Sequence, residues 1–212
     1  MAELTTRDTK LIQYLNEAYG KEKELETALQ AHIAMTTRAP YKRRLKEHLQ
    51  ETKGHSRGLQ RRIKQLGGKA EVVPAPGPVA DAAGAVTGAA SRAVAAAKGP
   101  LHVLRGTGEQ EKMLKNAKTE YSEEHEEIAT YTAIEALAES VGDRETAKLA
   151  RGIRREEEKM ARFLERLIPS LTKAVSQQEI PAAERRRNGR RRRTTGSRSR
   201  SRGGRRTKSR SR

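Results

Sequence analysis

Acidic residues recur on the apolar side of a helical pattern in the stretch EYSEEHEEIATY, residues 120–131. A helix turns by about 100° per residue, so positions spaced by three and four share one face. By this rule Glu124 and Glu127 lie on the same face as Ile134 and Val141. A buried carboxylate without a partner is costly. This face therefore requires a cation, a proton or a hydrogen-bonding partner.

Carboxylates and imidazoles occur at comparable positions in three other helical patterns of the chain. They are Glu22 in the first pattern, His48, Glu51 and His55 in the second, and Glu156 and Glu157 in the fourth. Any one of these acids could be solvated or paired with Lys or Arg, but the coincidence across four helices favours a common ligand. A pair of divalent metal ions in a bundle core makes such a set favourable. Oxygen and imidazole ligands suit iron or manganese, with zinc as a further option.

Apolar periodicity predicts four helices that would position these residues. Their expected ranges are about 9–37, 41–66, 109–141 and 144–168, the last ending at Pro169 or soon after. Short turns pair them as two antiparallel hairpins, and the Ala/Gly/Pro-rich residues 68–108 connect the hairpins. Residues 79–98 of this connection can form a further helix. We predict an all-α, ferritin-like four-helix bundle over residues 1–175 with one long crossover, and a simple up-and-down bundle is the alternative.

Composition supports a helical protein and excludes several classes of function. The 212 residues include one Phe, no Trp and no Cys, so disulfides, zinc fingers and thiol chemistry are ruled out. No nucleophile and base occur at a recognisable catalytic spacing. The amino terminus lacks the apolar run of a secretory signal, and no stretch of 18 apolar residues occurs. We expect a cytoplasmic protein without a transmembrane segment.

The sequence resembles the ferritin-like superfamily, and within it the YciF-type branch of bacterial stress proteins. The resemblance rests on YGKEKEL (19–25), LKEHLQETKGHSRGL (45–59), EEHEEIATYTAIEALAESVG (123–142) and REEEKMARFL (155–164). It covers roughly residues 9–170 and stops before the basic carboxyl terminus. The resemblance implies a four-helix bundle with an added crossover helix, a homodimer and a dinuclear metal site.

The resemblance also implies which residues hold the metal ions. Matched position by position, the carboxylate ligands are Glu22, Glu51, Glu127 and Glu157, with Glu124 and His55 as the next candidates. The sequence departs from the superfamily's Glu-x-x-His pattern in two places. The residue three after Glu51 is Gly54, and the residue three after Glu157 is Met160. His48 and His55 can substitute on the second helix, and an asymmetric site is therefore allowed.

The carboxyl-terminal residues 176–212 form an Arg/Ser-rich segment that we predict to be disordered. Of the 45 Lys and Arg residues, 15 lie in residues 185–212, which leaves 30 basic against 27 acidic residues before them. With no aromatic residue for stacking, the segment is typical of sequence-independent binding to DNA or RNA phosphates. The expected contacts are Arg185, Arg186, Arg187, Arg190, Arg191, Arg192, Arg193, Arg198, Arg200, Arg202, Arg205 and Arg206.

These patterns combine into one functional hypothesis with one alternative. The hypothesis is a dinuclear metal-binding stress-response protein that oxidises Fe(II) with O2 or peroxide while its tail holds it on nucleoid DNA. The alternative is a nucleoid-associated or scaffolding bundle with a degenerate metal site, in which the internal acids are paired rather than metallated.

Overall fold

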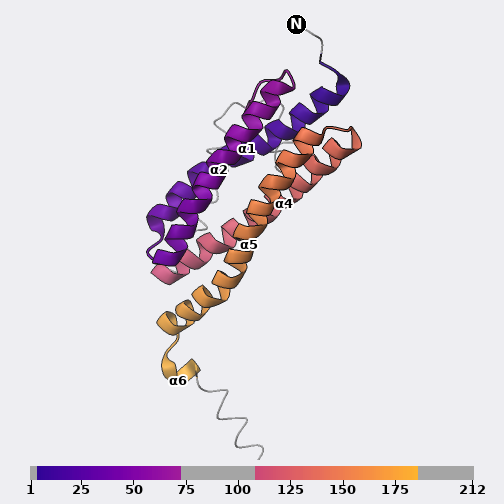
Figure 1. Cartoon of the computed structure of the whole chain (residues 1–212). Coiled ribbons are helices and arrows are strands. Elements are labelled where there is room, and N and C mark those ends of the chain that lie inside the picture. The colour runs from indigo at the N-terminus through magenta and orange to yellow at the C-terminus, as the bar shows by residue number, and fades with distance from the viewer. Residues whose placement is uncertain (1–3, 73–107, 186–212) are drawn as a thin grey trace, which may run out of the picture.

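A computed structural model describes residues 4–72 and 108–185 of the chain. The described residues form the long helices α1 (Thr6–Met35), α2 (Ala39–Gln65), α4 (Glu109–Ser140) and α5 (Arg144–Glu179), and the short α6 (Ala182–Arg185). The four long helices pack as a bundle (Figure 1). The predicted all-α bundle is confirmed. The helix predicted over residues 79–98 lies outside the described residues, as does the basic segment from residue 186 onward.

Local signals in the sequence set the helix ends. The Thr5 hydroxyl caps α1 by accepting a hydrogen bond from the backbone N–H of Asp8 at 3.1 Å. Pro40 lies in the first turn of α2, where its missing N–H costs no hydrogen bond. The chain leaves α2 at Gly67 and α4 at Gly142, whose φ angles are 86° and 72°. Glycine adopts this left-handed conformation without strain, so each helix ends sharply.

Helix α5 is longer than the sequence predicted, and the expected end near Pro169 is wrong. Pro169 lies inside α5, which continues to Glu179. A proline inside a helix removes one hydrogen bond and disturbs the preceding turn. Beyond it, however, Leu171 is fully buried and Val175 packs against the same apolar cluster. This packing compensates for the proline, and α5 extends past the other long helices in Figure 1. Its last residues and α6 fall within the segment predicted to be disordered.

The helix directions define the topology. α1 packs against α2 and α4, while α5 packs against α4 and α2. His32 near the end of α1 pairs with Glu120 in the first half of α4, whereas Leu11 near the start of α1 shares an apolar cluster with Ala138 near the end of α4. α1 and α4 are therefore antiparallel, which makes α2 and α4 run in the same direction. The chain between α2 and α4 must join opposite ends of the bundle, as in ferritin-like folds.

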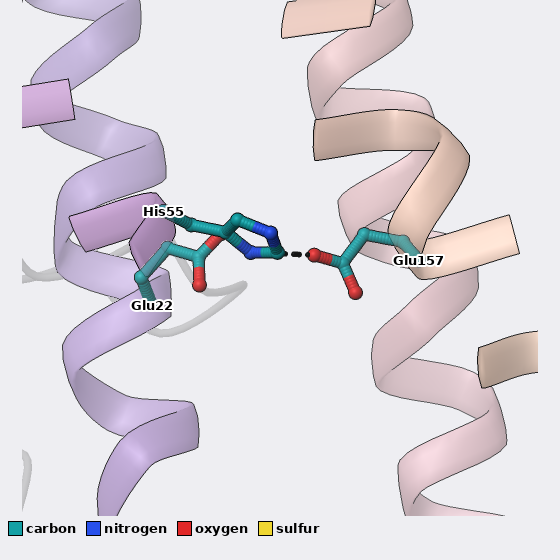
Figure 2. Close-up of side chains that lie close together, drawn as sticks. All are labelled: Glu22, His55 and Glu157. Carbon is teal, nitrogen blue, oxygen red and sulfur yellow. Dashed lines mark ion pairs between the residues drawn. The ribbon is translucent and has the colours of Figure 1, made fainter. Parts of the chain in front are cut away.

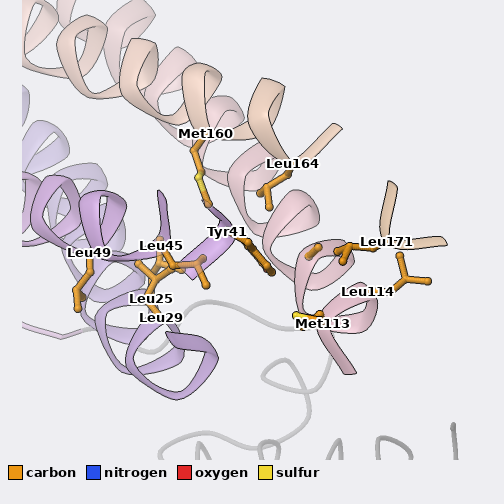
Figure 3. Close-up of a cluster of buried hydrophobic side chains, with 11 residues drawn as sticks. Leu25, Leu29, Tyr41, Leu45, Leu49, Met113, Leu114, Met160, Leu164 and Leu171 are labelled. Carbon is orange, nitrogen blue, oxygen red and sulfur yellow. The ribbon is translucent and has the colours of Figure 1, made fainter. Parts of the chain in front are cut away.

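The core is arranged in layers along the helices. One apolar layer, drawn in Figure 3, contains Leu25, Leu29, Tyr41, Leu45, Leu49, Met113, Leu114, Ala117, Met160, Leu164 and Leu171. A second layer, toward the other end of each helix, contains Leu15, Ala18, Leu59, Ile63, Tyr131, Ile134, Ala150 and Ile153. Between them all four helices bury polar side chains, namely Glu22, His48, Thr52, His55, Glu124, Glu127 and Glu157. The two apolar layers enclose this polar layer and shield it from water.

Candidate metal centre

Four predicted carboxylates are buried in the polar layer. Glu22 of α1, Glu124 of α4 and Glu157 of α5 are 0% exposed, and Glu127 of α4 is 4% exposed. Each lies on the apolar stripe of its helix, which is why packing the bundle buries it. Acidic residues are almost never buried this completely without a compensating partner. Four buried acids in one layer therefore require cations, protons or hydrogen-bond donors to neutralise them.

Three side chains of the polar layer form a first group that can hold a metal ion: Glu22, His55 and Glu157. His55 Nδ1 lies 2.9 Å from Glu157 Oε1 and 3.3 Å from Glu22 Oε1. Figure 2 shows the three side chains converging from α1, α2 and α5. Their three ligand atoms lie within 4.8 Å of one another, close enough to contact a common ion.

A second group, made of His48, Glu124 and Glu157, lies beside the first. His48 Nε2 is 3.0 Å from Glu124 Oε1 and 3.6 Å from Glu157 Oε2. Glu157 belongs to both groups, and it turns Oε1 toward His55 and Oε2 toward His48. A carboxylate placed in this way is suited to bridge two ions.

Each histidine has one ring nitrogen inside the centre and the other against a carboxylate nearer the surface. His48 Nδ1 lies 3.2 Å from Glu51 Oε2, and His55 Nε2 lies 2.7 Å from Glu156 Oε2. Arg44 in turn donates to Glu51 Oε2 at 2.8 Å. Such outer carboxylates fix the tautomer and ring orientation of a metal-binding histidine.

The structure places Glu51 differently from the ligand predicted by the sequence. Glu51 lies outside both groups and its side chain is 21% exposed, whereas the adjacent Thr52 is fully buried. On α2 the inward positions belong to His48 and His55 instead. Their separation of seven residues, or two helical turns, is a signal in the sequence that places them on one face.

Glu127 and Tyr131 of α4 complete the layer. Both carboxylate oxygens of Glu127 are buried and have no hydrogen-bond partner among the described residues. Burial raises the pKa of Glu127 well above its usual value, and the nearby Glu22 and Glu157 raise it further. The Tyr131 hydroxyl donates a hydrogen bond to Glu22 Oε1. Burial raises the pKa of Tyr131 well above its usual value, so this hydroxyl keeps its proton.

Without metal ions, protons would neutralise much of this charge. Burial alone would lower the pKa of both histidines, but neighbouring carboxylates outweigh it. Chiefly through Glu124, the pKa of His48 rises to about 10, and through Glu157 and Glu22 the pKa of His55 rises to about 11. Burial raises the pKa of Glu124 to about 8. The layer can therefore exchange protons for cations, as metal ligands in proteins do.

The residues present fit a pair of divalent ions. Within the described part of the chain, the buried oxygens of the centre without a hydrogen-bond or ion-pair partner include Glu22 Oε2, Glu124 Oε2 and both oxygens of Glu127. Leaving such atoms unpaired costs free energy, which coordination to a cation would recover. Four ionised carboxylates carry the charge that two divalent cations neutralise, with both histidines neutral. A donor set of oxygen and imidazole nitrogen suits iron, manganese or zinc.

The fold and the buried carboxylate–histidine layer define a ferritin-like helical-bundle protein. Within that class the chain belongs to the family described as a domain of unknown function, DUF892, whose model matches residues 6–98 and 82–177. This assignment and the similarity to the Escherichia coli stress protein YciF described below confirm the predicted YciF-type branch. A search of curated proteins gave no match.

Solved structures show the same fold. A protein from Xanthomonas campestris is 26% identical with a TM-score of 0.61, and the match covers 82% of this chain and 99% of that one. The Escherichia coli stress protein YciF is 22% identical with a TM-score of 0.59 and coverages of 80% and 98%. The diiron bacterioferritin of Desulfovibrio desulfuricans is 18% identical with a TM-score of 0.59 and coverages of 82% and 86%.

The predicted nucleic-acid contacts and the predicted absence of a transmembrane segment can be compared with the structure only over the described residues. Among the arginines predicted to contact nucleic acid, Arg185 is described, and it is exposed at the end of α6. The other eleven lie outside the described residues. Within residues 4–72 and 108–185, no helix is long and apolar enough to cross a membrane.

Proposed function

We propose that the bundle binds two divalent metal ions, with iron as the favoured metal and manganese or zinc as alternatives. The observation that carries this proposal is the position of Glu157, whose two oxygens face two different histidines in two adjacent groups. Glu22 and His55 would complete the binding of one ion, and Glu124 and His48 that of the other. Glu127 adds a fourth buried carboxylate to the same layer.

When occupied, such a centre would supply the oxidation of Fe(II) substrate, with O2 or peroxide as the electron acceptor. The chain's own residues would bind the ions and orient the side chains that hold them. Glu51 and Glu156 hold the two imidazoles, and Tyr131 holds Glu22 through its hydroxyl. Glu124 and Glu127, whose pKa values are raised, release protons when cations bind. The apolar layers exclude bulk water from the centre on the two sides along the bundle axis.

Metal content after anaerobic loading tests this function. The full chain should bind two equivalents of Fe(II), Mn(II) or Zn(II), measured by elemental analysis after gel filtration. Glu22→Ala and Glu127→Ala should lower this number, whereas Glu139→Ala, an exposed acid on α4, should not. If the wild-type chain retains no stoichiometric metal, the metal proposal is wrong. The scaffolding bundle, with its acids neutralised by protons and internal pairs, is then the better description.

We further propose that the basic segment after α6 binds nucleic acid without sequence specificity and keeps the bundle on nucleoid DNA. Support comes from its composition, since 15 of the last 28 residues are Arg or Lys and none is acidic. Consuming Fe(II) and peroxide near DNA would limit radical damage there. Fluorescence anisotropy with a labelled DNA duplex should show binding that weakens steeply with salt. A chain ending at Arg185 should lose that binding, and retained binding would show that another segment is responsible.

A further inference from the structure

A cavity of about 100 Å3 lies between α1 and α4, beside the metal centre. Its lining includes Lys21 and Glu24 from α1 and Glu123, Glu126 and Glu127 from α4. A buried water molecule needs about 10–15 Å3 of such volume, so the cavity has room for several waters or for a hydrated ion. Four of these five side chains are acids, so the lining favours cations.

The lining of the cavity passes from solvent to the polar layer. Glu24 and Glu126 are exposed, Lys21 and Glu123 are half-buried, and Glu127 is 4% exposed. Glu127 is also a candidate metal ligand, and both its oxygens are buried without a hydrogen-bond partner among the described residues. The cavity therefore ends at a carboxylate that belongs to the centre itself. Glu22 and Glu157 do not line the cavity and are 0% exposed.

Lys21 places a positive charge in this otherwise acidic passage. Its Nζ lies 2.7 Å from Glu126 Oε1. This ion pair with Glu126 holds the ammonium group in the lining of the cavity. An incoming cation would meet this ammonium before it reached Glu127. The ammonium interacts with the same acids that would attract the cation.

We propose that the cavity between α1 and α4 is the path by which divalent cations reach the centre, and that Lys21, anchored by Glu126, opposes their passage. The inference rests on the proposed metal function. A cleft lined by one sign of charge raises the local concentration of counter-ions and their association rate. A fixed charge of the opposite sign at its mouth reduces that effect. Glu24, Glu123 and Glu126 attract the ion, and Glu127 receives it.

The rate of Co2+ binding to the full chain tests the path, with stopped-flow absorbance of the bound ion as the readout. Lys21→Met removes the charge and keeps a side chain of similar length, and it should speed binding by about three- to tenfold. Lys23→Met is the matched control, because Lys23 lies on the same helix and pairs with Glu26 at 2.8 Å, outside the cavity. The control should bind Co2+ at the wild-type rate.

The acids of the cavity provide the converse test. Glu24→Gln should slow Co2+ binding about threefold at low salt, and the difference should shrink as salt screens the charge. Glu17→Gln, on α1 but outside the lining, is its control. The equilibrium number of bound ions should stay the same in all four variants.

Failure of the path and failure of the metal function give different results. If the chain binds two Co2+ ions but Lys21→Met and Glu24→Gln leave the rate unchanged, cations do not use this cavity and only the path is wrong. If the wild-type chain binds no Co2+ at equilibrium, both proposals fall.

Discussion

Two clusters of buried charge in this bundle differ in how well they are neutralised. At the start of α5, Asp143 is 3% exposed, and its Oδ1 and Oδ2 each accept a hydrogen bond from Thr146 at 3.0 Å. Arg62 of α2 adds contacts of 2.8 and 2.6 Å to the same two oxygens. In the metal centre, by contrast, both oxygens of Glu127 lack a hydrogen-bond partner among the described residues.

This contrast distinguishes a charged cluster that stabilises the fold from one that is suited to bind a ligand. A buried charge whose hydrogen bonds are all made stabilises the fold, because removing either partner strands the other. A buried charge with unmade hydrogen bonds costs stability, and proteins keep such groups mainly where a ligand or reaction requires them. We therefore expect mutations at the Asp143 cluster to affect the free energy of unfolding. Mutations at the centre should affect metal affinity.

The largest effect should come from Glu157→Gln. This change removes the carboxylate shared by both groups, so the affinity for divalent ions should fall by at least about 100-fold, more than outer-shell changes usually cause. Without metal, the change in stability should be smaller than the change in affinity, because His48 keeps Glu124 and His55 keeps Glu22 and Glu156 as carboxylate partners. Competition with a fluorescent chelator measures the affinity. Glu158→Gln, the next residue and half-exposed in a pair with Arg154, is the control; equal effects of the two changes would contradict the assignment.

Asp143→Ala should show the opposite behaviour. It removes the cap of α5 and leaves Arg62 without its carboxylate partner, so the free energy of unfolding should fall by about 2–4 kcal/mol. Urea denaturation in the presence of a chelator measures this loss. The number of metal ions bound by the folded variant should equal that of the wild type. A reduced number would mean that the two clusters are coupled.

Glu51→Ala should have a smaller effect, confined to one side of the centre. If Glu51 orients His48, its loss should lower the affinity for one of the two ions by about tenfold. Glu47→Ala, on the same helix and exposed, is the control. Co2+ titration followed by absorbance resolves the two binding steps. A loss as large as that of Glu157→Gln would show that Glu51 is itself a ligand, as the sequence predicted.

Acid should weaken the Asp143 cluster in a defined direction. Burial would raise the pKa of Asp143, but the Thr146 N–H and Arg62 hold it below its ordinary value of 3.8. The unfolded chain therefore takes up the proton first, and the stability contributed by the charge is complete above pH 3.8. It is lost as the pH falls through the lower folded value. Asp143→Asn keeps the cap but not the charge, so its stability deficit should shrink over that range in urea titrations. A constant deficit would exclude this origin.

Helical periodicity was sufficient to predict the fold and the burial of most acids in the polar layer. Glu22, Glu124, Glu127 and Glu157 lie in line with apolar residues three and four positions away, so any bundle that buries those stripes buries the acids too. The position of Glu51 could not be read in this way. Glu51 lies at the edge of the stripe of α2 and turns outward to Arg44 in the structure, whereas Thr52 is fully buried.

The end of α5 was missed for a different reason. A proline is read locally as a helix terminator, but Leu171 gains its burial from the bundle, which the local pattern does not contain. The pairing of His48 with Glu124 and Glu157 likewise depends on the relative heights of α2, α4 and α5, that is, on how far each helix is shifted along the bundle axis. Those heights are set by side-chain packing between helices and are not encoded in the period of any one of them.

The extension of α5 also separates the metal centre from the carboxyl-terminal segment. From Glu157 to Glu179 a helix rises about 33 Å, at about 1.5 Å per residue. The arginine-rich terminus is therefore attached at a distance from the residues that would bind metal. A protease that cuts after Glu179 would remove most of the excess positive charge and leave every residue of the centre in place. The bundle and its terminus should thus behave as separable modules, and the terminus could be transferred to another protein without the bundle.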